Sequence, residues 1–152
     1  MGVFTVSADG HEFFERIETY LSLDQLARVR DAFEYACQKH GSQMRKSGEP
    51  YVTHPTTVAY YLAGYQLDAN ALIAALLHDV AEDTPASVPE LNERFGYEVA
   101  QIVDGVTKFK ASVDDKPNGG LSAEQQATAT LNKLFRFMTR DVRVVLIKLF
   151  DR

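Results

Sequence analysis

The stretch ALLHDVAEDT, residues 75–84, joins an apolar helical run to four titratable side chains. Helical residues four apart lie one above the other, so His78 stacks on Glu82 and Asp79 stacks on Asp83. These rows predict a polar face at the C-terminal end of a buried helix. That end carries the negative pole of the helix dipole, where each carboxylate is disfavoured by some tenths to about 1 kcal/mol. A divalent metal held by His78 and Asp79 would remove the conflict, with Glu82 and Asp83 beside it for proton transfer.

The composition indicates a single globular domain. The chain has 152 residues, 45% of them apolar and 24% charged, which is enough to bury a core. It contains no apolar run of membrane-spanning length and no signal peptide, so we expect a cytoplasmic protein without membrane contact. Its one cysteine, Cys37, falls in a predicted helix and is expected to be a structural thiol. The net charge of −5 argues against general nucleic-acid binding but allows a phosphorylated ligand where basic residues cluster.

Apolar periodicity and capping residues predict an all-α protein of about seven helices. Residues 1–9 are expected to form a loose tail. Residues 109–121, which contain Pro, Asn and two Gly without apolar periodicity, are expected to form a mobile loop or lid. The predicted helix caps are Ser22, Thr53, Asp68, Ser87, Ser122 and Asp141.

The polar segment GSQMRKSGEPYVTHP, residues 41–55, lies between two predicted helices. Loops of this kind often carry functional residues. This one brings Arg45 and Lys46 close to His54, which is expected to project from a helix start. Asp151 is a further candidate, because it directly follows an apolar helical run. On these residues alone three other interpretations stay open: a capping His54, a solvated basic pair and a frayed terminal Asp151.

His54, His78, Asp79 and Asp151 come from three separate predicted helices and offer mixed imidazole and carboxylate ligands. Such ligands suit Mn²⁺, Fe²⁺, Zn²⁺ or Mg²⁺. Four protein ligands leave positions open for a water, whose pKa the metal lowers, and for a phosphoryl oxygen. A carboxylate one turn away can take the proton from that water. With the basic pair of residues 41–55 available for phosphate oxygens, the sequence predicts metal-assisted hydrolysis of a phosphate ester.

Four segments resemble, in the same order, the hydrolase domain of the RelA/SpoT homologue family, the alarmone synthetase–hydrolases with an HD-domain fold. They are RKSGEPYVTHP, ALLHDVAEDT, FGYEVAQIVDGVTK and DVRVVLIKLFDR, and the likeness spans roughly residues 25–152. The resemblance implies an HD-domain helical bundle and a Mn²⁺-dependent enzyme that removes pyrophosphate from the 3′ position of (p)ppGpp, leaving GDP or GTP. It also implies a parent protein with synthetase and regulatory domains.

Carried over by position, the resemblance assigns roles to individual residues. Glu82 and Asp83 match the acidic pair that activates water and assists the reaction. Arg45 matches a residue that packs on the guanine, Lys46 matches one near phosphate, and Ser47 matches a further nucleotide contact. The metal ligands that the resemblance implies are His54, His78, Asp79 and Asp151.

Three features depart from the family pattern. Phe150 stands where a small alanine is usual, and residues 129–133, ATLNK, replace a more polar stretch. The chain also stops at Arg152, before a helix that completes the nucleotide pocket in family members, so it resembles a truncated, C-terminally incomplete domain over residues 1–152. Two alternatives stay open: an HD phosphohydrolase of another nucleotide, and a catalytically silent metal-binding regulatory module.

Overall fold

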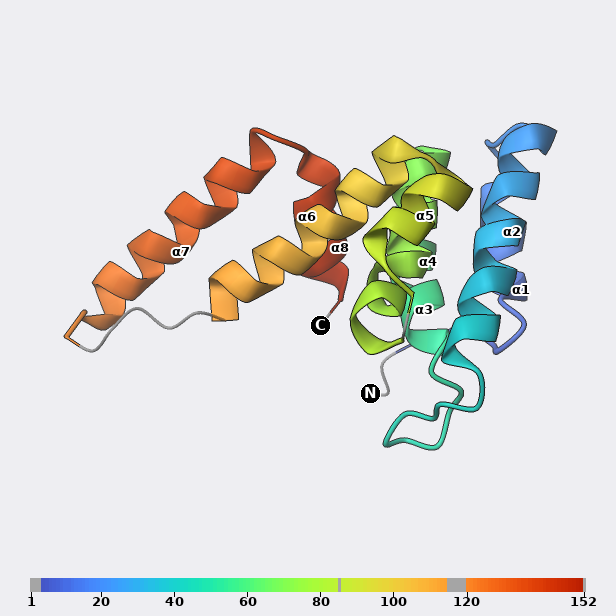
Figure 1. Cartoon of the computed structure of the whole chain (residues 1–152), viewed down its shortest axis with the longest axis horizontal. Coiled ribbons are helices and arrows are strands. Elements are labelled where there is room, and N and C mark those ends of the chain that lie inside the picture. The colour runs from blue at the N-terminus through green and yellow to red at the C-terminus, as the bar shows by residue number, and fades with distance from the viewer. Residues whose placement is uncertain (1–3, 85, 115–119, 152) are drawn as a thin grey trace.

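The computed structural model describes residues 4–84, 86–114 and 120–151, and these ranges contain eight helices (Figure 1). The all-α prediction is confirmed, with one helix more than the approximate count of seven. No helix in the described ranges is both long and apolar enough to cross a bilayer. The helices are α1 (His11–Ile17), α2 (Leu23–His40), α3 (Thr53–Gly64), α4 (Ala69–Asp83), α5 (Val88–Phe95), α6 (Tyr97–Asp114), α7 (Ala123–Met138) and α8 (Val142–Phe150).

Helix α4 is the centre of the bundle. Its N-cap is Asp68, whose side chain accepts a hydrogen bond from the backbone N–H of Ala71 at 3.3 Å. Every residue from Ala71 to Val80 is buried, because α2, α3 and α6 pack around the helix (Figure 1). A helix that is apolar on all sides is stable only when it is covered in this way. The covering also encloses His78 and Asp79, which are buried with their apolar neighbours.

Helix α8 packs against α6 and ends beside the polar end of α4. Gly105 of α6 permits this close approach, since a Cβ atom at that position would lie 2.8 Å from Cγ2 of Val144. The beginning of α8 is fixed by Arg143, whose guanidinium forms ion pairs with Asp68 at 2.8 Å and with Glu98 at 2.7 Å. These contacts join α8 to the first turns of α4 and α6, so the three helices form one rigid support for the site.

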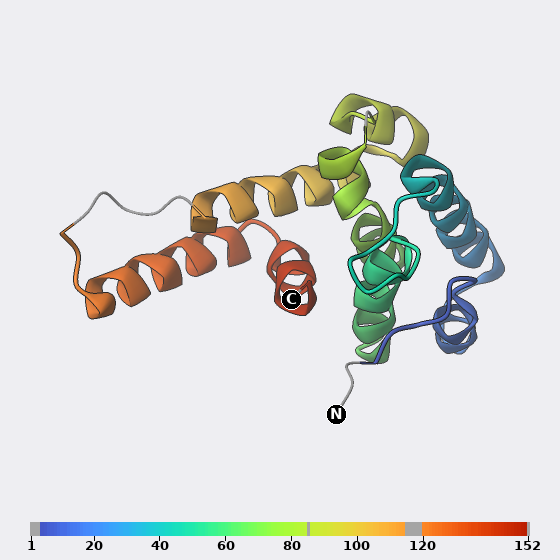
Figure 2. The ribbon, with the colours of Figure 1, turned by 90° about the horizontal axis from the view of Figure 1, so that it is seen from below.

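Helix α7 and the C-terminal part of α6 form an arm that extends from the rest of the bundle (Figures 1 and 2). α7 contains no buried residue. Three of its large apolar side chains face solvent, since Leu131, Phe135 and Met138 are between 44% and 61% exposed. The described residues therefore leave this side of α7 uncovered.

The predicted lid is wrong over its first half. Helix α6 continues to Asp114, so residues 109–114 are helical, whereas residues 115–119 of the predicted lid lie outside the described residues. The reason is a tertiary contact: the ring of Phe109 is buried against Phe137 of α7, with 5.1 Å between ring centroids. Packing of this kind overrides the weak local helix preference.

The prediction of a loose N-terminal tail is wrong from residue 4 onward, and residues 1–3 lie outside the described part. Val6 is buried, and its N–H donates to the Thr57 hydroxyl of α3 at 3.1 Å. The ring of Phe4 lies 5.0 Å from that of Tyr60, also on α3. Two apolar side chains are therefore enough to dock this segment on the bundle.

Most predicted caps are observed, but Thr53 is not a cap. It is the first residue of α3, and its hydroxyl donates to the carbonyl oxygen of Pro50 at 2.8 Å. Ser87 accepts from the N–H of Glu90, whose carboxylate does not reciprocate but accepts from the Tyr35 hydroxyl at 2.6 Å. The side chains that cap as predicted are Ser22, Asp68, Ser87, Ser122 and Asp141.

Candidate metal centre

His78 lies in the buried part of α4, and the helix itself orients its ring. The side chain is 1% exposed, and Nδ1 lies 2.5 Å from the carbonyl oxygen of Ala75. A carbonyl oxygen can only accept, so Nδ1 carries a hydrogen and Nε2 faces the other candidate ligands. Orientation of the ring by a backbone carbonyl is a common property of metal-binding histidines.

The candidate ligands converge from α3, α4 and the end of α8. Oδ1 of Asp151 lies 2.5 Å from Nε2 of His54 and 3.2 Å from Nε2 of His78. Oδ2 of Asp79 lies 3.3 Å from Nε2 of His78 and 3.7 Å from that of His54. All four ligand atoms lie within 4.8 Å of one another. The structure thus brings together the four side chains that the sequence nominates, at a spacing that one ion could bridge.

Asp79 has a carboxylate oxygen that no described residue satisfies. Its Oδ2 is buried without a hydrogen-bond partner, although Nε2 of His78 is 3.3 Å away. Burial raises the pKa of Asp79, and the charge of Asp151 raises it further. An unpaired buried carboxylate is costly, whereas a cation in contact with it would compensate the charge. The donor set therefore fits a divalent metal ion.

His78 and Asp151 form a tightly coupled pair. Burial lowers the pKa of His78, but the hydrogen bond with Asp151 and the charge of Asp79 outweigh burial and raise that pKa to about 9. Burial likewise raises the pKa of Asp151, but hydrogen bonds from His54, His78 and Lys148 outweigh it and hold that pKa well below its usual range. His78 is therefore doubly protonated and positively charged at neutral pH in the metal-free chain. A metal must displace that proton in order to bind.

Glu82 and Asp83 lie one helical turn beyond the candidate ligands and have different partners. Oε2 of Glu82 lies 3.0 Å from Nζ of Lys110 on α6, and the Glu82 side chain is 16% exposed. Oδ2 of Asp83 accepts a hydrogen bond from the Tyr51 hydroxyl at 2.9 Å. Helix α4 continues to Asp83, so the stacking of these two acids on His78 and Asp79 follows from helical geometry. Different parts of the chain therefore hold the two carboxylates.

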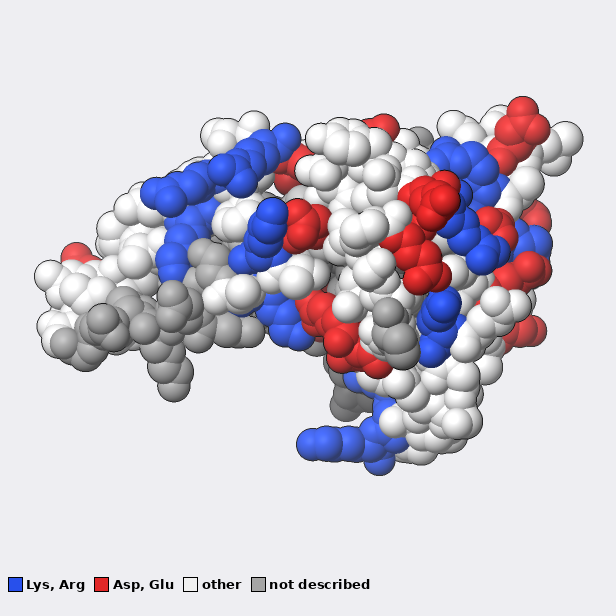
Figure 3. Space-filling model, viewed as in Figure 1, with Lys and Arg blue, Asp and Glu red and all other residues white. Residues whose placement is uncertain are grey.

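Arg45 and Ser47 line a cavity of about 380 Å³ that also reaches His54. This volume lies within the range of small-molecule sites. The N–H of Arg45 donates to the carbonyl oxygen of Glu49 at 2.8 Å, which closes the loop that carries both residues. Lys46 is exposed and does not line the cavity. Basic side chains project at the lower end of the molecule, where this loop lies (Figure 3).

Phe150 lines the same cavity. Its bulk does not separate Asp151 from the other candidate ligands. Its ring stacks on that of Tyr61, with 5.8 Å between centroids and 15° between planes. Asp151, the next residue, still reaches His54. The aromatic residue at this position therefore forms a wall of the cavity.

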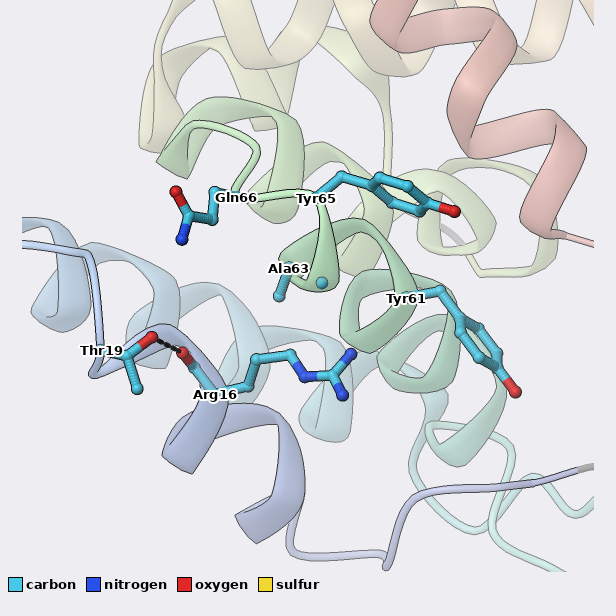
Figure 4. Close-up of a pocket in the computed structure, with 7 residues that line it drawn as sticks. Arg16, Thr19, Tyr61, Ala63, Tyr65 and Gln66 are labelled. Atoms are coloured by element: carbon cyan, nitrogen blue, oxygen red, sulfur yellow. Dashed lines mark hydrogen bonds between the residues drawn. The ribbon is translucent and has the colours of Figure 1, made fainter.

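A cavity of about 570 Å³ lies elsewhere, between α1 and the end of α3 (Figure 4). Arg16 in this cavity donates to the carbonyl and hydroxyl oxygens of Tyr60, at 3.1 and 2.7 Å. The rings of Tyr61 and Tyr65 point away from Arg16 (Figure 4). Among the described residues that line it there is no carboxylate, histidine or predicted site residue. This cavity is larger than the one beside His54, and its lining includes none of the candidate metal ligands.

Three residues that touch the candidate centre escape prediction from the sequence. Nζ of Lys148 contacts Oδ2 of Asp151 at 3.1 Å, and their spacing of three residues on a helix is a usable signal. Lys110 falls in the stretch 109–121, which is predicted to be a loop. Tyr51 lies in a segment without periodicity, so nothing in the sequence indicates where its hydroxyl points.

The chain is similar to several known proteins. A family model described as an HD domain matches residues 32–152. The chain is 47% identical over 137 residues to the bifunctional (p)ppGpp synthase/hydrolase SpoT of Escherichia coli K12, covering 90% of this chain and 18% of that protein. It is 42% identical over 142 residues to the guanosine-3′,5′-bis(diphosphate) 3′-pyrophosphohydrolase of Spiroplasma citri, covering 93% and 18%. A probable GTP pyrophosphokinase of Mycobacterium leprae is 47% identical over 127 residues, covering 84% and 15%.

A solved structure described by the words "A metazoan ortholog of SpoT hydrolyzes ppGpp and plays a role in starvation responses" has a similar fold. The TM-score is 0.53 at 25% sequence identity, and the match covers 88% of each chain. The curated relatives are much longer, since the chain spans between 15% and 18% of their length.

Proposed function

The chain belongs to the HD-domain family, and from that membership we propose that it is a metal-dependent hydrolase domain that removes pyrophosphate from the 3′ position of (p)ppGpp. The products are GDP or GTP and pyrophosphate. One observation carries the proposal: His54, His78, Asp79 and Asp151 converge within 4.8 Å, in a chain that resembles proteins named as (p)ppGpp hydrolases. Because those relatives are longer, we also propose a parent protein with synthetase and regulatory domains.

The proposed cofactor is Mn²⁺, with other divalent ions as possible substitutes. His54, His78, Asp79 and Asp151 would hold it, since their mixed nitrogen and oxygen donors suit such ions. A divalent ion in this place lowers the pKa of a bound water and polarises a phosphoryl oxygen. The preference for Mn²⁺ among the divalent ions rests on the family resemblance.

Glu82 and Asp83 are the proposed acidic pair of the reaction. Water adds to the phosphorus atom bonded to the 3′ oxygen, the P–O3′ bond breaks, and the 3′ oxygen takes up a proton. Glu82 is the proposed acceptor of the proton of the attacking water, and two observations support this role: it lies one turn past the candidate ligands, and Lys110 holds its side chain at 3.0 Å. Asp83 adds a second carboxylate on the same flank.

The loop 44–50, which carries Arg45, Lys46 and Ser47, is the proposed nucleotide contact. Arg45 packs on the guanine and Lys46 lies near phosphate, as in the family, and Ser47 adds a polar contact. Support comes from the cavity of about 380 Å³, which places Arg45 and Ser47 beside His54. A guanidinium stacks on flat rings and pairs with phosphate oxygens, which suits a nucleotide.

Release of pyrophosphate from ppGpp with added Mn²⁺ tests the proposal. The wild-type chain should turn over, whereas Glu82→Gln with Asp83→Asn should keep the metal and lose turnover. A matched control changes two exposed acids of α2, Asp24→Asn with Glu34→Gln, and should remain active. Turnover by the doubly altered acidic pair would show that its assignment is wrong.

Two further outcomes correspond to the alternatives. Hydrolysis of another nucleotide but not of ppGpp would favour a different HD phosphohydrolase. Binding of Mn²⁺ without hydrolysis of any nucleotide would favour a catalytically silent regulatory module.

A further inference from the structure

Tyr51 connects the loop 44–50 to the acidic end of α4. Its hydroxyl donates to Oδ2 of Asp83 at 2.9 Å, and its N–H donates to the carbonyl oxygen of Gln43 at 2.9 Å. The side-chain amide of Gln43 donates in turn to the carbonyl oxygen of Asp83 at 3.3 Å. Asp83 therefore accepts hydrogen bonds from both ends of the loop 44–50.

The loop 44–50 depends on these two ends for its position. Met44 and Pro50 pair in an isolated antiparallel bridge, which closes the loop upon itself. The side chains of Arg45 and Lys46 make no hydrogen bond or ion pair with the rest of the chain that the structure describes. They are therefore free to meet a ligand, but their location is set by the backbone that Gln43 and Tyr51 anchor.

The ring of Tyr51 is half-buried between two histidines. It lies 4.7 Å from the ring of His40, which is 3% exposed, and 6.3 Å from the ring of His54. The packing of the Tyr51 ring and the hydrogen bond from its hydroxyl to Asp83 are thus two separate interactions that hold Tyr51 in place. Removing the hydroxyl alone leaves the aromatic contacts in place and isolates the contribution of the hydrogen bond.

We propose that Tyr51 is a positioning residue that uses Asp83 to hold the Arg45–Lys46 loop over the cavity beside His54. This inference rests on the proposed function and divides the work of the acidic pair. Glu82, which is paired with Lys110, takes part in proton transfer, whereas the main role of Asp83 is to hold the loop 44–50 in place. Tyr51 therefore acts on binding of the nucleotide and not on the chemical step.

The test compares Tyr51→Phe with Tyr35→Phe. The Tyr35 hydroxyl donates to the Glu90 carboxylate at 2.6 Å, between α2 and α5, so both variants lose a tyrosine–carboxylate hydrogen bond. With Mn²⁺ and ppGpp, Tyr51→Phe should raise KM about tenfold and leave kcat within about twofold, as expected for one lost hydrogen bond to a charged group. Tyr35→Phe should leave both constants unchanged.

A second readout needs no catalytic activity. Trypsin cleaves after Arg45 and Lys46, so cleavage there reports how tightly the loop is held. We expect Tyr51→Phe to speed this cleavage about tenfold relative to Tyr35→Phe. Asp83→Ala should speed it equally, and the double variant with Tyr51→Phe should add little, because both changes remove the same bond.

Two results would overturn the inference. One is equal trypsin cleavage in Tyr51→Phe and Tyr35→Phe, because the hydroxyl would then not hold the loop. The other is a lower kcat with unchanged KM in Tyr51→Phe, because Tyr51 would then act on proton transfer through Asp83. If the wild-type chain fails to hydrolyse ppGpp, the proposed function fails, and the trypsin comparison still decides whether Tyr51 holds the loop.

Discussion

His54 and Asp151 are separated by 97 residues in the chain, yet Nε2 of one lies 2.5 Å from Oδ1 of the other. Two further candidate ligands, His78 and Asp79, are buried between them on α4. A cluster assembled from three distant segments exists only when the chain is folded. A metal bound to it therefore stabilises the folded state.

Asp79→Asn should change stability mainly when the metal is present. In EDTA, the variant loses a buried charge that has no hydrogen-bond partner, but it also loses the attraction between that charge and protonated His78, so the two effects offset each other. Added Mn²⁺ should raise the melting temperature of the wild type well above that of the variant. Thermal unfolding with and without Mn²⁺ measures both. A variant whose melting temperature rises with Mn²⁺ as much as that of the wild type would contradict the metal assignment.

The metal-free chain should lose stability as the pH rises above neutrality. The pKa of His78 is raised from 6.5 to about 9 in the folded state, so its contribution is fully present below pH 6.5 and is lost as the pH rises through about 9. Urea unfolding in EDTA across this range measures the slope, which His78→Gln should flatten. If the free energy of unfolding depends on pH equally in the wild type and in the variant, His78 is not the group that loses its charge over this range. The affinity for Mn²⁺ should instead increase over the same range, because the metal competes with that proton.

Gly105→Ala should disturb the centre from a distance. The new methyl group would meet Cγ2 of Val144 at 2.8 Å and push α8, which carries Asp151, away from α6. We expect a loss of about 1–3 kcal/mol from overpacking, partly offset by about 1 kcal/mol of better helix propensity, and weaker Mn²⁺ binding. Calorimetric titration with Mn²⁺ checks the affinity. Combination with Val144→Ala should restore it, and failure of that rescue would mean that the close approach does not position Asp151.

Lys110→Met should slow turnover without weakening metal binding. Lys110 fixes the carboxylate of Glu82, and its loss should lower kcat about tenfold because catalysis is sensitive to small misplacements. Stability should change by less than about 1 kcal/mol, since the pair is partly exposed. The control is Lys108→Met, because Lys108 pairs with Asp104 on its own helix at 2.8 Å. Equal kcat values in the two variants would show that Lys110 has no role in turnover.

The local sequence predicts the centre well where helical spacing alone decides the geometry. His78, Asp79, Glu82 and Asp83 fall on one face because α4 is continuous to Asp83. Capping residues such as Asp68 likewise mark helix starts correctly. In both cases the determining contacts lie within one helical turn.

Tertiary contacts explain what the sequence did not predict. Residues 109–114 contain no strong helix signal and become helical because α6 is held by Phe109 against α7. Lys110 reaches Glu82 only because that segment is helical. The Tyr51 hydroxyl finds Asp83 through the path of an irregular loop, which follows no period. Contacts of this kind depend on distant parts of the chain.

The most direct measurement is a titration of EDTA-treated chain with Mn²⁺ while pyrophosphate release from ppGpp is recorded. Turnover should rise in proportion to bound metal and stop rising at one ion per chain, and Asp151→Asn should show weaker binding and little turnover. Full turnover in the metal-free chain, or saturation that Asp151→Asn leaves unchanged, would contradict a catalytic metal centre built from His54, His78, Asp79 and Asp151.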